Sequence, residues 1–348
     1  MKDISNVALA ALTSLHAGGK AKNLIELEPG DNLASVIAGA GKPLQVLGYG
    51  TNILVSDKGL PGTVILDRVG RIELLGSGKI RADSGANWDE LVQTAIKNNL
   101  WGLEFTSGIP GGVGAAIAGG IAAYGHKVED SLIEATILNT KNGSLISWPK
   151  DKLGFGYRSS SLQKPENGHL IVLDATFSLS SSSQGELQYE SALKTAQEMG
   201  LEPDSLANRR KIILQTRRRA GSLLQDTTVG PWTAGSFFKN PMVGEAEIRK
   251  IIDHEETNTT REMLLRQNVI HGGSRARVSA AHVLLAAGFH RGQTWDQVRL
   301  HPDHILKIEN LGKAAASDIY KVVQLIISTV KEKLGIDLEP EVRFIGEF

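Results

Sequence analysis

The stretch LQVLGYGTN, residues 44–52, decides how the rest of the chain should be interpreted. An apolar run typical of a buried strand leads directly into two glycines, as in a dinucleotide-binding fingerprint. The third glycine of that fingerprint is replaced by Ile53, and no helical pattern begins there. We therefore expect a loop outside the Rossmann fold, in which backbone amides and the side chains of Thr51 and Asn52 can bind an anion.

A second glycine-rich stretch, TSGIPGGVGAAIAGG, occupies residues 106–120. It contains no P-loop, because the first lysine after it is Lys127. Its glycine content predicts a loop and argues against a stable interior helix. Two backbone-rich loops about sixty residues apart would suit a long ligand with a pyrophosphate and flat rings, such as a flavin dinucleotide.

Around these loops, strand and helix patterns occur without a regular βαβ alternation, which predicts α+β domains. Strands are expected at residues 44–48, 63–67, 71–75, 79–83, 134–140, 169–180 and 341–345. Helices are expected at residues 88–96 with Asn87 as the cap, and at 189–219, 245–255, 278–288 and 319–334.

The totals limit the class of protein. A chain of 348 residues predicts two to three domains. Lysine plus arginine and aspartate plus glutamate both number 38, which argues against a nucleic-acid partner. Cysteine is absent, so disulfides, thiolate catalysis and cysteine-ligated zinc are excluded. No apolar run approaches the length of a membrane span, and a cytoplasmic location is expected.

The stretch TAGSFFKNP, residues 233–241, spaces a serine and a lysine as S-x-x-K acyl enzymes do. That chemistry needs a helix, which Pro241 and Gly235 oppose. A serine hydroxyl can instead give its proton to a strongly basic enolate, provided that the transient charge is held by other groups. Arg158, in GYRSS, and Glu341, in the last strand, are the candidates for that support.

Six motifs in this order resemble the UDP-N-acetylenolpyruvoylglucosamine reductase family, also called UDP-N-acetylmuramate dehydrogenases. They are LGYGTN at 47–52, GIPGGVGAAIAGGIAAYG at 108–125, FGYRSS at 155–160, AGSFFKNP at 234–241, HILKIENLG at 304–312 and LEPEVRFIG at 338–346. The resemblance covers nearly the whole chain and points to the subtype with an extra tyrosine loop. It implies an α+β fold, with a two-subdomain FAD-binding module of the PCMH/vanillyl-alcohol-oxidase type followed by a C-terminal α+β substrate-binding domain.

The resemblance also implies a division of the chain and a reaction. FAD-binding subdomain 1 would span residues 1–66, with the last strand, 337–348, returning to it. FAD-binding subdomain 2 would span 67–225, and the substrate-binding domain 226–336. The enzyme would use bound FAD and the hydride donor NADPH to reduce UDP-N-acetylglucosamine enolpyruvate in peptidoglycan precursor synthesis, with hydride going from flavin N5 to C3. A monomer without a metal ion is expected.

Site residues carry over from the resemblance by position. Ser236 would protonate C2, while Arg158 and Glu341 would stabilise the enolate. The residues expected to bind the cofactor are Gly48, Tyr49, Gly50, Thr51, Asn52, Ile53, Ser107, Gly108, Ile109, Pro110, Gly111, Gly114 and Ala115. The residues expected to bind the substrate are Tyr124, Tyr189, Arg219, Lys239, Asn240 and His304.

The chain departs from the family pattern at three places. Gly119-Gly120 stands where asparagine is common, His282 replaces a frequent tryptophan, and Arg219 is the nearest cation to a family lysine expected before AGSFF. Three alternatives remain open at this point. One is an FAD-dependent oxidase of the same fold acting on another substrate, and another is a binding protein without catalysis. The third is a metal hydrolase that uses His301 and His304, although histidines three residues apart are weak support for a metal site.

Overall fold

The computed structural model describes residues 1–183, 185–223, 230–254 and 276–348. The chain forms two compact units. The first unit comprises residues 1–7, 21–50 and 61–219, and the second comprises residues 8–20, 51–60 and 220–348. The three-domain division stays a prediction, and parts of its third domain, 226–229 and 255–275, lie outside the described residues.

The first unit contains a four-stranded sheet in the order β1 (Lys2–Ala8), β2 (Lys20–Glu26), β5 (Leu60–Leu66) and β3 (Leu44–Leu47). Strands β3 and β5 are parallel, with Leu47 opposite Leu66. Helix α1 (Leu33–Gly39) begins at Asn32, whose side chain accepts a hydrogen bond from the Ser35 amide. A small apolar core joins this helix to the sheet and includes Ile25, Leu27, Ile37 and Ile65.

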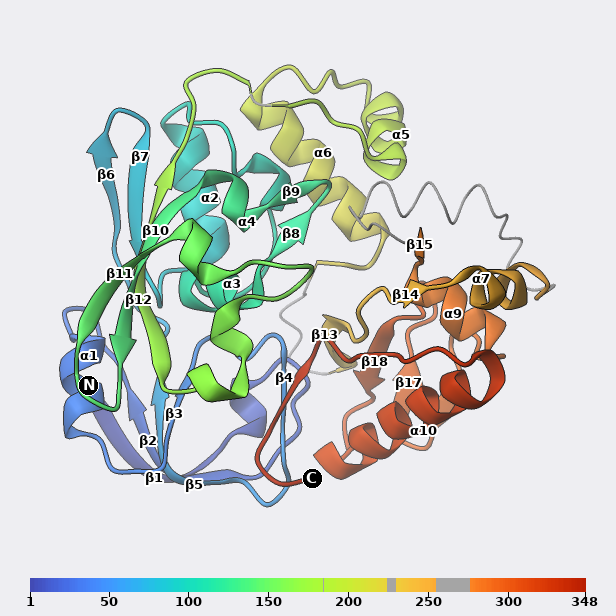
Figure 1. The fold of residues 1–348 in the computed structure, drawn as a ribbon, viewed down its shortest axis with the longest axis horizontal. Helices are drawn as coiled ribbons and strands as arrows, with labels where there is room; N and C mark the ends of the chain where they lie inside the picture. The colour runs from blue at the N-terminus through green and yellow to red at the C-terminus, as the bar shows by residue number, and fades with distance from the viewer. Residues whose placement is uncertain (184, 224–229, 255–275) are drawn as a thin grey trace. The chain divides into compact units, whose positions relative to one another are not determined.

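A five-stranded antiparallel sheet forms the larger part of the first unit (Figure 1). Its order is β11 (Leu145–Pro149), β10 (Leu132–Asn139), β12 (Leu170–Ser178), β7 (Lys79–Asp83) and β6 (Ile72–Gly76). Helices α2 (Trp88–Lys97) and α3 (Val113–Gly119) share one buried core with β7, β10 and β12. Asn87 caps α2 by accepting a hydrogen bond from the Glu90 amide, as predicted.

Two predictions for the first unit need correction. The glycine-rich stretch does contain a short helix, α3, because the amides of Val113 and Gly114 donate to the Ala86 and Ser84 carbonyls and so satisfy its first turn. The helical pattern at 189–219 forms two helices, α5 (Glu190–Met199) and α6 (Leu206–Arg219), because Gly200 takes a left-handed conformation that ends α5.

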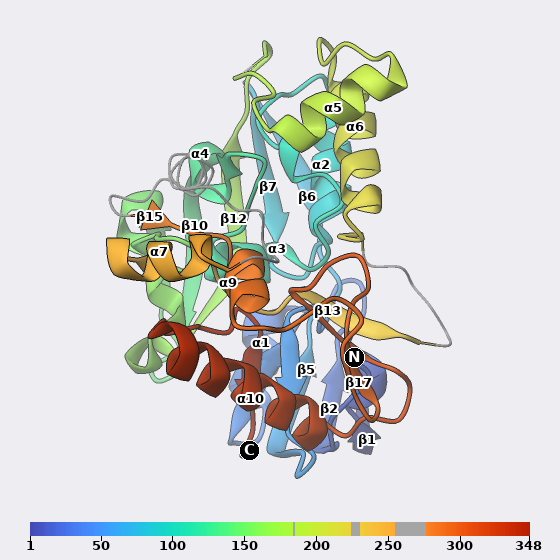
Figure 2. The ribbon, with the colours of Figure 1, turned by 90° about the vertical axis from the view of Figure 1, so that its right-hand side faces the viewer.

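The second unit is built on a sheet in the order β13 (Trp232–Ser236), β18 (Lys307–Asn310), β17 (Val298–Leu300) and β16 (Thr294–Trp295). Helices α7 (Glu245–Ile252), α9 (Ala280–Ala286) and α10 (Ala316–Leu334) share its core (Figure 2). The two-residue strands β14 (Met242–Val243) and β15 (Ala276–Arg277) pair beside them. Strand β19 (Arg343–Ile345) pairs in parallel with β4 (Ile53–Val55), so the end of the chain returns to the segment after the first glycine turn.

None of the described helices combines the length and the apolar composition that crossing a bilayer requires.

Candidate active site

The side chain of Tyr49 stabilises the first glycine turn, residues 48–50, through hydrogen bonds to the neighbouring backbone. The Tyr49 hydroxyl lies 3.3 Å from the carbonyl oxygens of both Arg68 and Gly85, and Arg68 Nε donates to the Gly48 carbonyl at 3.0 Å. Burial raises the pKa of Tyr49, which keeps the hydroxyl protonated as a donor. The Tyr49 side chain therefore fixes the turn, and any contact of Gly48 to Gly50 with a ligand falls to the backbone.

The same loop enters the second unit between Gly50 and Thr51. There, Ser14 Oγ donates to the Thr51 carbonyl at 3.2 Å, and the Arg343 amide donates to the Asn52 carbonyl at 3.1 Å. Asn52 Nδ2 donates to the Glu341 carbonyl at 3.1 Å. The predicted cofactor residue Asn52 and the predicted catalytic residue Glu341 are thus joined directly.

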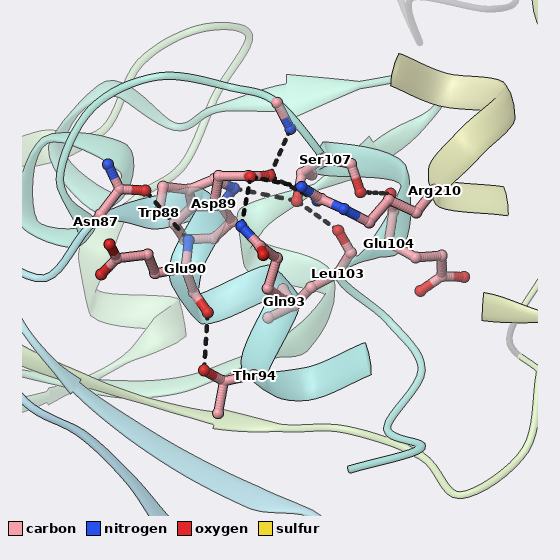
Figure 3. Close-up of polar contacts among 12 residues, drawn as sticks. Asn87, Trp88, Asp89, Glu90, Gln93, Thr94, Leu103, Glu104, Ser107 and Arg210 are labelled. Carbon is pink, nitrogen blue, oxygen red and sulfur yellow. Dashed lines mark hydrogen bonds and ion pairs between the residues drawn. The ribbon is translucent and has the colours of Figure 1, made fainter. Parts of the chain in front are cut away.

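The second glycine loop, residues 107–112, is held by hydrogen bonds to the first turn of α2 and to Glu104, which lies between α2 and the loop (Figure 3). The Gly108 amide donates to Asp89 Oδ1 at 2.7 Å, and the Trp88 amide donates to the Gly111 carbonyl at 2.9 Å. Ser107 is fully buried, and its hydroxyl donates to the Glu104 carbonyl at 2.6 Å. The Ser107 side chain is therefore engaged within the loop.

The rest of this loop suits a group with phosphate oxygens. Among the described residues, no acceptor is bonded to the amides of Gly111 and Gly112. A Cβ on Gly112 would lie 3.0 Å from the Ser84 carbonyl oxygen, and one on Gly114 would lie 2.9 Å from Ser84 Cβ. Adjacent backbone amides without side chains form a concave donor surface, as anion-binding nests do. The residues present therefore fit the pyrophosphate of FAD.

Two tight turns in the first unit carry the predicted residues Tyr124 and Arg158. The hairpin of β8 (Ala122–Ala123) and β9 (His126–Lys127) places Tyr124 at its tip with φ +50°. Arg158 has φ +52° in a turn closed by hydrogen bonds between Gly156 and Ser159. Arg158 Nη1 donates to the Ala122 carbonyl at 2.8 Å, which ties the second turn to the hairpin. Non-glycine residues with positive φ are uncommon and concentrate at functional sites.

Tyr189, the residue at which α5 begins, is the third member of this cluster. Its ring packs edge-on against the Tyr124 ring, with centroids 5.6 Å apart. Burial raises the pKa of Tyr189, while the positive charge of Arg158 acts in the opposite direction. Three residues predicted from distant parts of the sequence, Tyr124, Arg158 and Tyr189, therefore lie together.

Helix α6 contributes a cation to this cluster, Arg217, which is not among the predicted substrate residues. Burial lowers the pKa of the Arg217 guanidinium, and Tyr124 and Arg158 are among the groups that act on it. Arg219, the predicted substrate residue, is exposed and forms an ion pair with Glu198 of α5. Arg217, Arg218 and Arg219 are consecutive in helix α6, so their side chains point to different sides of the helix. This helical spacing was the sequence signal that could have singled out Arg217.

Ser236 lies at the end of β13 in the second unit and is half-buried. No helix follows it, since Phe238 forms a strand-like bridge with Pro340, as expected from Pro241. The Glu341 amide donates to the Phe237 carbonyl at 2.8 Å. A second backbone hydrogen bond, from the Lys239 amide to the Glu339 carbonyl at 2.9 Å, also joins the segments of the predicted proton donor and the predicted acid. Glu341, expected within the last strand, lies two residues before β19, which begins at Arg343.

The other predicted substrate residues of the second unit have structural contacts of their own. Lys239 Nζ donates to Glu339 at 2.6 Å, and Asn240 Oδ1 accepts the Ala280 amide at the start of α9 at 2.9 Å. Burial, reinforced by the positive charge of Lys307, lowers the pKa of His304 to about 4. His304 is therefore neutral at physiological pH and can both donate and accept a hydrogen bond.

Comparison with known proteins gives consistent matches over the length of the chain. Residues 27–148 match the model of an FAD binding domain, and residues 225–345 match the model of the C-terminal domain of UDP-N-acetylenolpyruvoylglucosamine reductase. The UDP-N-acetylenolpyruvoylglucosamine reductase of Saccharopolyspora erythraea is 31% identical, covering 96% of this chain and 93% of that protein. The one from Mycobacterium sp. (strain MCS) is 32% identical, covering 98% and 96%.

The chain belongs to the UDP-N-acetylenolpyruvoylglucosamine reductase family. Its fold agrees with that of the UDP-N-acetylenolpyruvylglucosamine reductase from Thermus caldophilus, with a TM-score of 0.65 and 24% identity over 99% of this chain and all of that one. The predicted α+β fold with an FAD-binding module and a C-terminal domain is confirmed.

One motif shared with the reductase family serves the fold. In HILKIENLG, Glu309 is buried, and its Oε2 accepts a hydrogen bond from Arg299 Nε at 2.8 Å and forms an ion pair with Arg299 Nη2 at 2.7 Å. Asn310 Oδ1 accepts the amides of Gly312 and Ala314, and its Nδ2 donates to the Leu15 carbonyl. Among the described residues, no group of three or more histidine, aspartate or glutamate side chains could hold a metal ion.

The departure at Gly119-Gly120 has a packing reason in this reductase. Gly120 ends α3 in the left-handed conformation, with φ +58° and ψ +55°. A Cβ at this position would lie 2.7 Å from the Ser159 carbonyl oxygen, in the turn that carries Arg158. Asparagine can adopt that backbone conformation, but it would not fit against Ser159.

Proposed function

We propose that Ser236, Arg158 and Glu341 perform the proton chemistry of this family's reaction in the present chain. The chain is an FAD-dependent oxidoreductase that reduces the enolpyruvyl double bond of UDP-N-acetylglucosamine enolpyruvate to UDP-N-acetylmuramate. NADPH is the hydride donor, and the product is a precursor of peptidoglycan. Our proposal concerns which residues of the chain supply the proton and stabilise the negative charge in this reaction.

When held by the loop 107–112, FAD would supply the hydride chemistry of the reaction, with NADPH as the source of the hydride and C3 of the enolpyruvyl group as its destination. Negative charge then develops at C2 and the substrate carboxylate, and the chain must hold that charge and supply a proton. Ser236 Oγ gives its proton to C2, because an enolate is basic enough to take a proton from a hydroxyl. The guanidinium of Arg158 stabilises the carboxylate oxygens, and Glu341 assists from the segment before β19.

The observation that carries this proposal is the hydrogen bond from the Glu341 amide to the Phe237 carbonyl at 2.8 Å. It fixes the segment of Glu341 to the residue directly after Ser236. Phe237 and Phe238 are buried, with relative exposures of 0% and 2%, so the loop cannot shift without disturbing the core. A positioned donor is what proton transfer to a transient carbanion requires.

The cluster of Tyr124, Tyr189 and Arg217 supports binding of the substrate diphosphate in the first unit. Two protonated phenol hydroxyls and a guanidinium are donors to phosphate oxygens, and the raised tyrosine pKa values keep those hydroxyls protonated. We assign the cation of this subsite to Arg217 in place of Arg219. Lys239, Asn240 and neutral His304 stay proposed substrate contacts of the second unit.

The residue roles are tested by separating the two half reactions. Ser236→Ala should leave the rate of flavin reduction by NADPH close to that of the unchanged enzyme. It should slow flavin oxidation by the enolpyruvyl substrate by about 10²- to 10⁴-fold, the usual contribution of a positioned proton donor. Equal slowing of both half reactions in stopped-flow absorbance would instead assign Ser236 a structural role.

A monomeric state, a cytoplasmic location and the tyrosine-loop subtype remain proposals. Tyr189 at the start of α5, beside Tyr124, supports the subtype. Size-exclusion chromatography with light scattering tests the monomer.

A further inference from the structure

The second glycine loop depends on a residue outside its own neighbourhood. Ser107 and Gly111 of this loop form hydrogen bonds to backbone atoms, namely the Glu104 carbonyl and the Trp88 amide. The contact through Gly108 is different, because its amide donates to the side chain of Asp89. That carboxylate is in turn held by Arg210 of α6, through two parallel hydrogen bonds of 2.7 Å (Figure 3).

The Asp89 carboxylate is fully engaged by these contacts. Oδ1 accepts from the Gly108 amide and Arg210 Nη1, while Oδ2 accepts from Arg210 Nη2 and from Gln93 Nε2 at 3.0 Å. The side chains of Asp89 and Arg210 are only 23% and 19% exposed. A bidentate arginine–carboxylate pair has strict geometry, so the position of Arg210 determines where the oxygen facing Gly108 lies.

We propose that Asp89 is a positioning residue for the FAD loop 107–112, and that Arg210 acts through Asp89 to couple this loop to helix α6. The inference rests on the assignment of the loop to the cofactor. Gly108 has φ +73°, a conformation that a hydrogen bond to its amide helps to hold. Fixing Gly108 aligns the amides of Gly111 and Gly112 three and four residues later, because Trp88 anchors the loop at Gly111.

The coupling extends along α6 to the substrate cluster. Arg217 lies two turns of helix after Arg210, where its charge is close enough to Tyr124 and Arg158 for electrostatic influence. Order imposed on the FAD loop should therefore stabilise the helix that supplies Arg217, and the reverse must hold by linkage. The neighbouring Arg209 has another role, since it forms a buried ion pair with Glu104 and stacks on Trp101 and Phe105.

Four variants of the full-length protein test the inference. They are Arg210→Gln, Asp89→Ala, the double variant, and the control Arg218→Gln, which removes an exposed arginine of the same helix that donates to Gln215. Flavin affinity is measured by fluorescence titration of the flavin-stripped protein. Hydrogen–deuterium exchange of residues 107–112 and 206–219 is followed with and without FAD.

The expected result is a loss of FAD affinity of about tenfold or more in Arg210→Gln and in Asp89→Ala, with no further loss in the double variant. FAD should slow exchange of residues 206–219 in the unchanged protein and in Arg218→Gln, and much less in the other variants. FAD affinity and exchange of Arg210→Gln equal to those of the control would overturn the inference, as would additive losses in the double variant. Failure of the unchanged protein to bind FAD would instead refute the assignment of the cofactor.

Discussion

Replacing Asp67 by asparagine should make the fold more stable at alkaline pH. Asp67 is buried, with 6% relative exposure, and Ser84 Oγ donates to its Oδ2 at 2.6 Å. Burial raises the pKa of Asp67 from 3.8 to about 6, against the effect of the Ser84 hydrogen bond. A Cβ added to Gly85 would lie 2.2 Å from both Asp67 Oδ1 and the Val69 carbonyl oxygen, so two acceptors face the same point. The site therefore favours the neutral acid.

The sign and size follow from proton linkage. Between pH 3.8 and about 6, the folded state retains a proton that the unfolded state has lost, so the free energy of unfolding falls as pH rises. The full difference is roughly 3 kcal/mol, at 1.36 kcal/mol for each pKa unit. Asparagine cannot ionise, and its amide oxygen can still accept from Ser84.

Urea denaturation of the flavin-free protein at pH values from 4 to 8 measures this effect. The Asp67→Asn variant should gain up to roughly 3 kcal/mol over the unchanged protein at pH 8 and much less at pH 4. Asp151→Asn, at an exposed position of the same unit, is the control. A gain of the same size at both pH values would refute the reasoning, because it would not depend on ionisation of Asp67.

Three other substitutions test contacts inside the first or the second unit. Glu104→Gln should destabilise the fold by about 3–5 kcal/mol, since it leaves buried Arg209 without its counter-charge; a loss below about 1 kcal/mol in urea would contradict this. Asp57→Ala should cost about 1–2 kcal/mol, because Asp57 accepts the Ala316 and Ser317 amides at the start of α10. Burial opposes ionisation of Asp57, but these bonds outweigh it and lower its pKa, so the cost should be present at pH 7 and disappear as pH falls below 3.8. Gly120→Ala should lower the melting temperature more than Gly143→Ala, which has a similar positive φ but no atom within 4 Å of the new Cβ; equal shifts would exclude the clash with Ser159.

The sequence predicted the regular elements whose patterns are local. Helix α2 was found with its cap because Asn87 and the apolar residues after it obey helical spacing. The strands expected at 79–83 and 134–140 are present as β7 (Lys79–Asp83) and β10 (Leu132–Asn139). In the first of them, Ile80 and Ala82 alternate with charged residues, as is typical of a half-buried strand. Strands β1 and β2 were missed, since β1 is largely exposed and carries no apolar alternation.

Most residues of the candidate site were predicted from the sequence, but the contacts between them were not. Tyr124 and Tyr189 came from the family resemblance, and Arg158 was first selected as a cation that could hold the enolate charge. Their proximity depends on two turns with positive φ that no local pattern specifies. Arg217 was missed because three consecutive arginines look alike in a sequence, and only the folded helix shows that Arg217 is half-buried while Arg218 and Arg219 are exposed. The link from Arg210 through Asp89 to Gly108 joins residues 121 and 19 positions apart, beyond any periodicity argument.

The most direct test of the account is whether the enolpyruvyl substrate reoxidises the reduced flavin. The purified protein is loaded with FAD, reduced with one equivalent of NADPH without oxygen, and mixed with UDP-N-acetylglucosamine enolpyruvate. The absorbance of oxidised flavin should return, and UDP-N-acetylmuramate should form in equal amount, while UDP-N-acetylglucosamine should leave the flavin reduced. Flavin that stays reduced with the enolpyruvyl substrate would contradict the account.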